Sequence, residues 1–131
     1  GCLLVMWHTP LYSSGFHRGS GDKMRPLWQL IDRQGADLVL SGHEHFYERF
    51  DPLDAEGQSP GDSQAPRQFV VGTGGARLHG FWKPPYRSKA RVLEHGVLQL
   101  SLERGSYSWR FIDVEGRVQD AGEARCRTTV N

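Results

Sequence analysis

The stretch LVLSGHEH, residues 38–45, places two histidines directly after a short apolar run. The run Leu38–Ser41 is typical of a buried strand, and alternate residues of a strand share one face. Past the strand end, Gly42 is expected to let the backbone turn, so that the imidazoles of His43 and His45 splay toward different metal ions. Paired histidines also occur on ordinary surfaces, so the spacing alone is a weak signal.

A second apolar run precedes a third histidine. Residues 3–7, LLVMW, are predicted to form a fully buried strand that ends just before His8. Over residues 25–34 the sequence favours a helix, because apolar residues recur at helical spacing at Met24, Leu27, Trp28 and Ile31. A strand–helix–strand unit normally has parallel strands. His8 and His43 are therefore predicted at the carboxyl ends of neighbouring strands, where open α/β sheets bind ligands.

The second half of the chain favours strands over helices. Residues 51–67, rich in Pro and Gly, are predicted to be a mobile loop. A strand is expected at 69–71, an irregular segment at 80–91, a hairpin from 97–102 and 107–113, and a further short strand at 117–119. Alternation in the hairpin predicts one core-facing row, made of Tyr107, Trp109 and Phe111. The predicted fold class is α/β to α+β: a βαβ unit followed by antiparallel strands, in a single domain over residues 1–131.

Composition gives little support for large charged partners. Lys and Arg number 16 against 15 Asp and Glu, a net charge of +1, which gives no reason to infer a nucleic-acid partner. No apolar run approaches the roughly 20 residues of a membrane-spanning helix. With 37% hydrophobic residues, the chain can bury one core of ordinary size. Cys2 and Cys126 make neither a zinc knuckle nor a redox motif, and whether they pair is left open.

The extended histidine motifs resemble one family. The segments WHTPLYSS (residues 7–14), GHEHFYER (42–49) and VGTGG (71–75) are similar to the C-terminal half of a calcineurin-like metallophosphoesterase. Within that superfamily they look most like the purple acid phosphatase-like branch. The resemblance implies the second half of an αββα sandwich, and phosphate-ester hydrolysis with two metal ions (Fe, Zn or Mn). Members of this branch are commonly periplasmic or secreted, which implies export of the longer parent protein.

The resemblance also assigns roles to individual residues. It implies that His8 and His43 ligate one ion and that His45 ligates the other. His17 falls where the branch often carries a histidine facing the substrate phosphate, and Arg18 is a further cationic candidate. Two ions about 3.5–4 Å apart can clamp a phosphate and activate a bridging water. No catalytic acid or base is assigned within this chain.

The chain departs from the family pattern in one large respect. The DxH, GDxx(D/Y) and GNH(E/D) motifs of the N-terminal half do not occur. The chain begins with Gly1, which we interpret as a missing N-terminus, so the ligand set is incomplete and the isolated chain is expected to be inactive. The alternative is a non-catalytic or structural fragment with at most a weak metal site. Loss of the partner sheet is expected to expose an apolar face of residues 3–7 and 38–40, covered by a homodimer or by another polypeptide.

Several other features have simpler interpretations. His79 and His95 have no motif around them and are expected to be surface or packing residues. Glu48 and Arg49 are candidates for acid–base groups, but a structural ion pair beside the site is the favoured interpretation. Residues 72–75 could cradle a phosphate, although a glycine cluster after a strand usually forms a turn.

Overall fold

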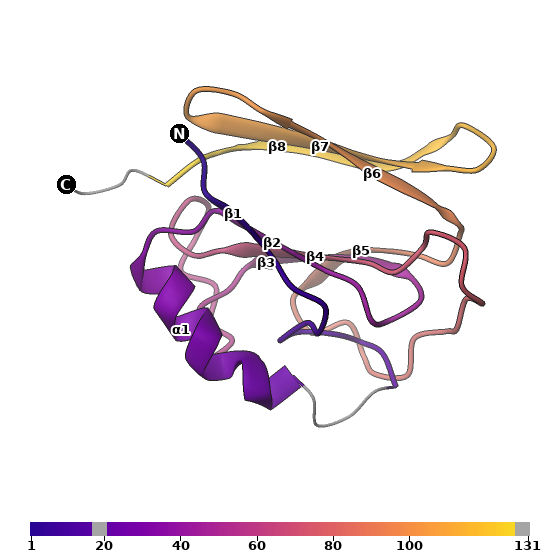
Figure 1. Ribbon diagram of the computed structural model, residues 1–131, viewed down its shortest axis with the longest axis horizontal. Coiled ribbons are helices and arrows are strands. Elements are labelled where there is room, and N and C mark those ends of the chain that lie inside the picture. Colours follow the sequence, from indigo (N-terminus) through magenta and orange to yellow (C-terminus); the bar gives the residue numbers. More distant parts are fainter. Residues whose placement is uncertain (17–20, 128–131) are drawn as a thin grey trace.

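A computed structural model describes residues 1–16 and 21–127 of the chain. Figure 1 shows two sheets stacked face to face and a helix on the outer side of one of them. The elements in chain order are β1 (Leu4–Met6), the 3-10 helix η1 (Gly21–Met24), α1 (Arg25–Arg33), β2 (Leu38–Ser41), β3 (Tyr47–Pro52), β4 (Arg67–Val71), β5 (Ser88–Val92), β6 (Gly96–Leu102), β7 (Ser106–Asp113) and β8 (Val118–Arg125).

The strand order places the histidine loops at one edge. Among the described residues, one sheet has the order β1-β2-β4-β3-β5 and the other β6-β7-β8. Strand β2 pairs in parallel with both β1 and β4, whereas β3 runs antiparallel to both of its neighbours, β4 and β5. The predicted class, a βαβ unit followed by antiparallel strands, is confirmed. The carboxyl ends of β1, β2 and β4 therefore meet at the same edge of the sheet.

Helix α1 covers the outer face of the five-stranded sheet. Its side chains Trp28 and Ile31 are buried against Val39 of β2, and the Trp28 indole N–H donates to the Leu53 carbonyl at 3.0 Å. Leu27, expected on the same face, is 39% exposed. The helix ends at Arg33, and Gly35 (φ 79°) just beyond it provides the left-handed residue that turns the chain away.

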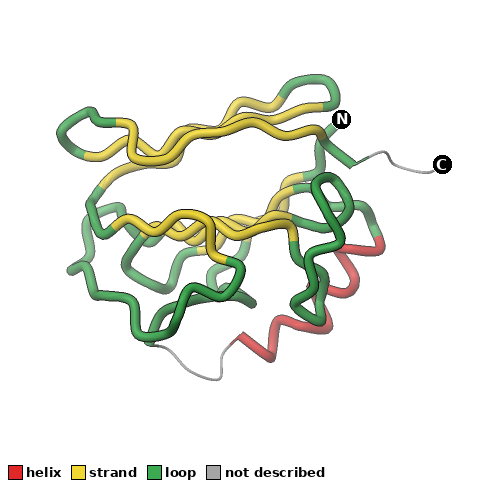
Figure 2. Tube along the Cα trace, turned by 180° about the vertical axis from the view of Figure 1, so that it is seen from behind, coloured by secondary structure: helices red, strands yellow, loops and turns green. Residues whose placement is uncertain are grey.

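The main core lies between the two sheets (Figure 2). The row predicted to face the core is confirmed, because Tyr107, Trp109 and Phe111 are at most 4% exposed. A bidentate ion pair also joins the layers: Arg49 donates to Asp120 at 2.8 and 3.0 Å. Both side chains are largely buried, so removing one partner would leave the other charge without compensation.

Two predictions about strands near the chain start were wrong. Strand β1 spans Leu4–Met6 and is not fully buried, since Leu3 is 41% and Met6 is 70% exposed. The reason is its place at the edge of the sheet. Residues 38–40 are not bare either, because strand β7 of the same chain covers Leu38, helix α1 covers Val39, and both side chains have 0% exposure.

The loops also differ from expectation in part. Strand β3 extends to Pro52 and β4 begins at Arg67, so both ends of the 51–67 segment belong to strands. Leu53 and Ala65 within it are buried, while its mobility stays a prediction. The segment expected to be irregular at 80–91 contains most of β5. Within the described part of the chain, no helix combines the length and apolar character required to cross a bilayer.

Candidate metal centre

Three loops meet at the carboxyl edge of the parallel strands. His8 follows β1, residues 42–46 follow β2, and Gly72 follows β4. Main-chain hydrogen bonds fasten them together: the Gly42 N–H donates to the His8 carbonyl at 3.0 Å, and the Gly72 N–H donates to the Phe46 carbonyl at 3.1 Å. The edge is therefore held by the backbone, and the side chains it presents have defined positions.

His8 and His43 form a close pair at this edge. Nδ1 of His43 lies 3.1 Å from Nε2 of His8, and the ring planes cross at 84°. Two imidazole nitrogens that ligate one ion at about 2.0–2.1 Å stand roughly 3 Å apart. Without an ion, one ring must donate a proton that the other accepts. A divalent cation can take the place of that hydrogen bond when the donor ring carries its proton on its other nitrogen, so the pair fits a shared metal ion.

The turn that separates the two histidines of the GHEH loop is at His43 itself. Its φ is 70°, a left-handed conformation that non-glycine residues seldom adopt, whereas we expected Gly42 to provide the turn. Such strained residues cluster at ligand and active sites. The conformation at His43 directs its ring toward His8.

His45 is held separately from the pair. Its Nδ1 lies 2.8 Å from the Arg77 carbonyl, which can only accept, so Nδ1 carries the proton and Nε2 has the lone pair. Metal-ligating histidines are commonly oriented in this way. Among the described residues, His8, His43 and His45 do not form a group whose ligand atoms all lie within 4.8 Å of one another. A site shared by all three is therefore absent from this geometry, and a ligand role for each stays a prediction.

Close packing fixes the loop that carries these histidines. Glu44 is 1% exposed, and its carboxylate lies where a Cβ on Gly15 would sit. A Cβ on Gly72 would likewise overlap the Glu44 carbonyl oxygen. Within residues 72–75, Gly72 is therefore required because the main chain of Glu44 approaches it closely. Beyond it the chain bends at residues 74–76, the buried Thr73 donates its hydroxyl to the Gly96 carbonyl, and Gly74 is exposed.

Glu48 and Arg49 both have structural contacts, but not with each other. Glu48 is fully buried and accepts hydrogen bonds from the Ser14 N–H, at 2.8 Å, and from the Ser14 hydroxyl. Burial raises the pKa of Glu48, although these hydrogen bonds oppose the shift. Arg49 pairs with Asp120 in the other sheet. The expected ion pair thus has a different acidic partner, and Glu48 ties the loop after β1 to β3.

Comparisons with known proteins identify the family of the chain. No family model matches the chain. Over 116 residues it is 36% identical to purple acid phosphatase 21 of Arabidopsis thaliana, an alignment that covers 82% of this chain and 26% of that protein. The chain belongs to the purple acid phosphatase-like branch of the calcineurin-like metallophosphoesterases. It spans about a quarter of the length of the curated relatives it matches.

Other relatives and solved structures are consistent with this family. Fe(3+)-Zn(2+) purple acid phosphatase 12 of Arabidopsis thaliana is 29% identical over 82% of this chain and 26% of that protein. Purple acid phosphatase PPD1 from yellow lupin seeds has the same fold, with a TM-score of 0.79 and 23% identity over 96% of this chain and 25% of that chain. The fold also matches GAP50, the anchor in the inner membrane complex of Plasmodium, with a TM-score of 0.73 and 19% identity over 97% of this chain and 37% of that one.

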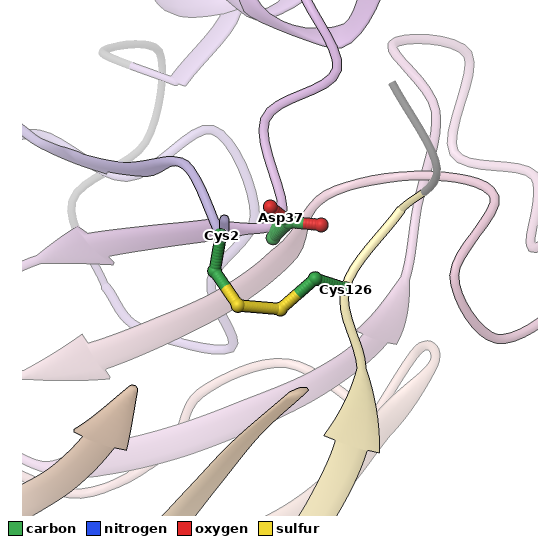
Figure 3. Close-up of side chains that lie close together, drawn as sticks. All are labelled: Cys2, Asp37 and Cys126. Carbon is green, nitrogen blue, oxygen red and sulfur yellow. A yellow bond between two sulfur atoms is a disulfide. The ribbon is translucent and has the colours of Figure 1, made fainter. Parts of the chain in front are cut away.

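One further cluster in this family member has metal-ligand chemistry but a structural role. Cys2 and Cys126 form a disulfide with a Cα–Cα distance of 5.4 Å, and Asp37 lies beside it (Figure 3). The sulfurs are bonded to each other, and each Asp37 carboxylate oxygen accepts a main-chain N–H, from Leu3 at 2.6 Å and from Arg127. The cluster fastens both ends of the chain to the start of β2.

Two further histidines of this purple acid phosphatase-like chain, His17 and His79, differ in what the structure describes. His17, expected to face the substrate phosphate, lies outside the described residues, as does Arg18. His79, which sequence reasoning set aside as a surface or packing residue, contacts the GHEH loop: its Nε2 accepts the His45 N–H at 3.0 Å. No spacing or motif in the sequence links residues 45 and 79. Only the tertiary path of the loop after β4 brings them together.

Proposed function

We propose that this chain contributes three histidines to the two-metal centre of a longer protein that hydrolyses phosphate esters. The observation that carries the proposal is the 3.1 Å separation between His43 Nδ1 and His8 Nε2. In this arrangement His8 and His43 hold one ion, and His45 offers Nε2 to the other. His17 contacts the substrate phosphate. The remaining ligands come from sequence that precedes the strands of this chain in family members.

The chemistry follows from what imidazole side chains can and cannot do. Two bound ions in such a centre supply a nucleophilic water at neutral pH and neutralise charge on the phosphate. To bind a metal ion, the histidines of this chain must be neutral and correctly oriented. The Arg77 carbonyl orients the ring of His45 through its hydrogen bond with Nδ1. Neutral imidazole suits Zn and Fe and does not by itself select the metal. The similarity to Fe(3+)-Zn(2+) purple acid phosphatase 12 supports an iron–zinc pair, with Mn as the further candidate.

A phosphatase assay tests the proposal. With p-nitrophenyl phosphate and added Zn²⁺, Mn²⁺ or Fe, we expect the longer protein to turn over and the 131-residue chain to show little or no activity, because it lacks a bridging carboxylate. His43→Ala in the longer protein should abolish turnover, whereas His95→Ala should not. Robust turnover by the 131-residue chain that His43→Ala abolishes would contradict the incomplete ligand set.

A non-catalytic role is the second candidate. The observation that favours it is the fold shared with GAP50, the anchor in the inner membrane complex of Plasmodium, so the fold alone does not show that the chain is part of an enzyme. The two candidates differ in one measurable property. If the longer protein hydrolyses no aryl phosphate with any of these metals bound, the scaffold role is supported and the hydrolase is excluded.

We also propose that the chain self-associates through an apolar cleft between the edge strands β1 and β6. The cleft has a volume of about 560 Å³, and its lining includes Met6, Leu40, Val71 and Val97. Met6 is 70% and Val97 is 62% exposed, and edge strands readily pair with another strand. Light scattering of the 131-residue chain should give a dimer that Val97→Lys weakens, with Val114→Lys on the β7–β8 turn as the control. A monomer at every concentration would exclude this interface.

The disulfide supports an oxidising compartment for the longer protein. Disulfides such as Cys2–Cys126 form and persist in secreted and periplasmic proteins and are rare in reducing cytosol. We therefore infer export. Fractionation of cells with maleimide labelling under denaturing conditions should find the pair blocked in the exported fraction. Free thiols at both positions in protein isolated from cells would exclude it.

A further inference from the structure

We propose that His79 is a positioning residue for His45, which it holds in the tautomer and orientation that a metal ligand requires. The inference rests on the proposed function in one respect only, namely that His45 binds an ion. The contacts between His79 and His45 belong to the chain itself, so they are testable with or without a metal.

Two hydrogen bonds of opposite direction join these residues. His79 Nε2 accepts the His45 N–H at 3.0 Å, and the His79 N–H donates to the His45 carbonyl at 3.3 Å. Both polar main-chain groups of His45 therefore contact the same residue, which fixes the backbone of the ligand. Because Nε2 accepts the hydrogen bond of an amide N–H, it uses its lone pair in that bond and carries no proton in this arrangement.

The ring of His79 also packs against the ring of His45. The ring centroids of His79 and His45 are 4.9 Å apart with an interplanar angle of 33°, and His79 also meets the buried Phe46 ring edge-on at 5.7 Å. The His79 ring thus covers one side of the His45 imidazole. A packed ring has fewer accessible rotamers than one in solvent, so the entropy lost when a metal binds is smaller.

The loop of His79 also determines which nitrogen of His45 is available. The Arg77 carbonyl, two residues before His79, lies 2.8 Å from His45 Nδ1 and fixes the proton there. Nε2 then has the lone pair that ligates. Partners of this kind are typically worth about 10–100-fold in metal affinity. The hydrogen bonds between His79 and the His45 backbone keep the Arg77 carbonyl in place. His79 therefore influences the His45 tautomer through the bond between Nδ1 and that carbonyl.

The surroundings of His79 favour a specific role over simple packing. Glu44 is buried, and its carboxylate lies 3.5 Å from His79 Nε2. A phenylalanine would fill the same space but offer no acceptor for the His45 N–H, and it would place an apolar edge beside this carboxylate. If the ring only packs, phenylalanine should be a tolerated replacement.

Three variants of the 131-residue chain separate these roles. His79→Phe keeps a ring and removes the acceptor, and His79→Gln restores a side-chain acceptor without the ring. His95→Phe is the matched control, because His95 bonds to the Ala76 carbonyl of the same loop at 2.9 Å but is not placed at the site. Long-range ¹H–¹⁵N NMR of the imidazoles reads the tautomer of His45, and a Zn²⁺ titration reads the affinity of its Nε2. Circular dichroism verifies that each variant is folded.

We expect a single Nδ1–H tautomer of His45 in the wild-type chain. His79→Phe should mix the tautomers and weaken Zn²⁺ binding at His45 by about 10–100-fold, and His79→Gln should recover part of this loss. Unchanged tautomer and affinity in His79→Phe, or an equal effect of His95→Phe, would overturn the positioning role. If Zn²⁺ does not perturb His45 in the wild-type chain, where the other ligands of its ion are missing, the tautomer of His45 in His79→Phe alone decides the role of His79.

Discussion

Nδ1 of His43 lies 3.1 Å from Nε2 of His8, although the two histidines are 35 residues apart in the chain. Each sits just past the end of a parallel strand, and the strands are direct neighbours in the sheet. The pair is thus a consequence of the βαβ topology. The left-handed backbone at His43 completes it by directing the ring across to β1.

Replacing Gly72 should disturb the site through the main chain. In Gly72→Ala the new Cβ would overlap the Glu44 carbonyl oxygen, and a backbone atom cannot move away as a flexible side chain can. We expect a loss of about 1–3 kcal/mol in the free energy of unfolding, measured by urea denaturation. Gly74→Ala, where a Cβ meets nothing within 4 Å, is the control. Equal stability of both variants would mean that the loops after β2 and β4 are less closely packed than described.

Removing the disulfide should destabilise the chain. Cys2 and Cys126 are separated by 124 residues, so the bond restricts nearly the whole unfolded chain. The double variant Cys2→Ser/Cys126→Ser should lose about 2–5 kcal/mol in the free energy of unfolding. Thermal unfolding of the wild type with and without reductant provides the comparison. If reductant lowers the melting temperature of the wild type and of the serine variant equally, the bond is not the cause.

Glu48 should give a characteristic pH dependence. Burial raises its pKa in the folded state above the ordinary value of 4.5, so the folded state binds more protons between these two pKa values. The contribution of Glu48 to stability is therefore fully present below about pH 4.5 and falls as the pH rises through the folded-state pKa. Glu48→Gln, which does not titrate, should gain stability relative to wild type between pH 4.5 and 7 in urea denaturation. A difference that is constant over this range would contradict the raised pKa.

The sequence was most informative where apolar residues are periodic and ordered along a βαβ unit. Residues 38–41 and the helix face of Trp28 and Ile31 have strong patterns, and the motif after β2 identified the family. Strand β3 was missed because YERFDP contains charged residues and Pro52, and its stability comes from tertiary partners. Arg49, for example, is neutralised by Asp120 from β8. The β-propensity of a short segment carries no information about such distant partners.

The candidate site was predictable only for the residues within motifs. His8, His43 and His45 are adjacent to predicted strand ends, so topology alone brings them to one edge. His79 enters from a loop whose course depends on Gly72 and on packing against Phe46, and neither leaves a pattern in the sequence. The pairing of Cys2 with Cys126 likewise depends on β8 returning to the start of β1.

A Zn²⁺ titration of the ¹⁵N-histidine-labelled chain tests most directly whether His8 and His43 form a metal-binding pair. We predict that His8 Nε2 and His43 Nδ1 change together as one equivalent of Zn²⁺ is added, and that His8→Ala or His43→Ala abolishes the change at the remaining partner. His95→Ala should leave the titration unaltered. If Zn²⁺ leaves both nitrogens unperturbed in the folded wild-type chain, the metal-binding pair is contradicted.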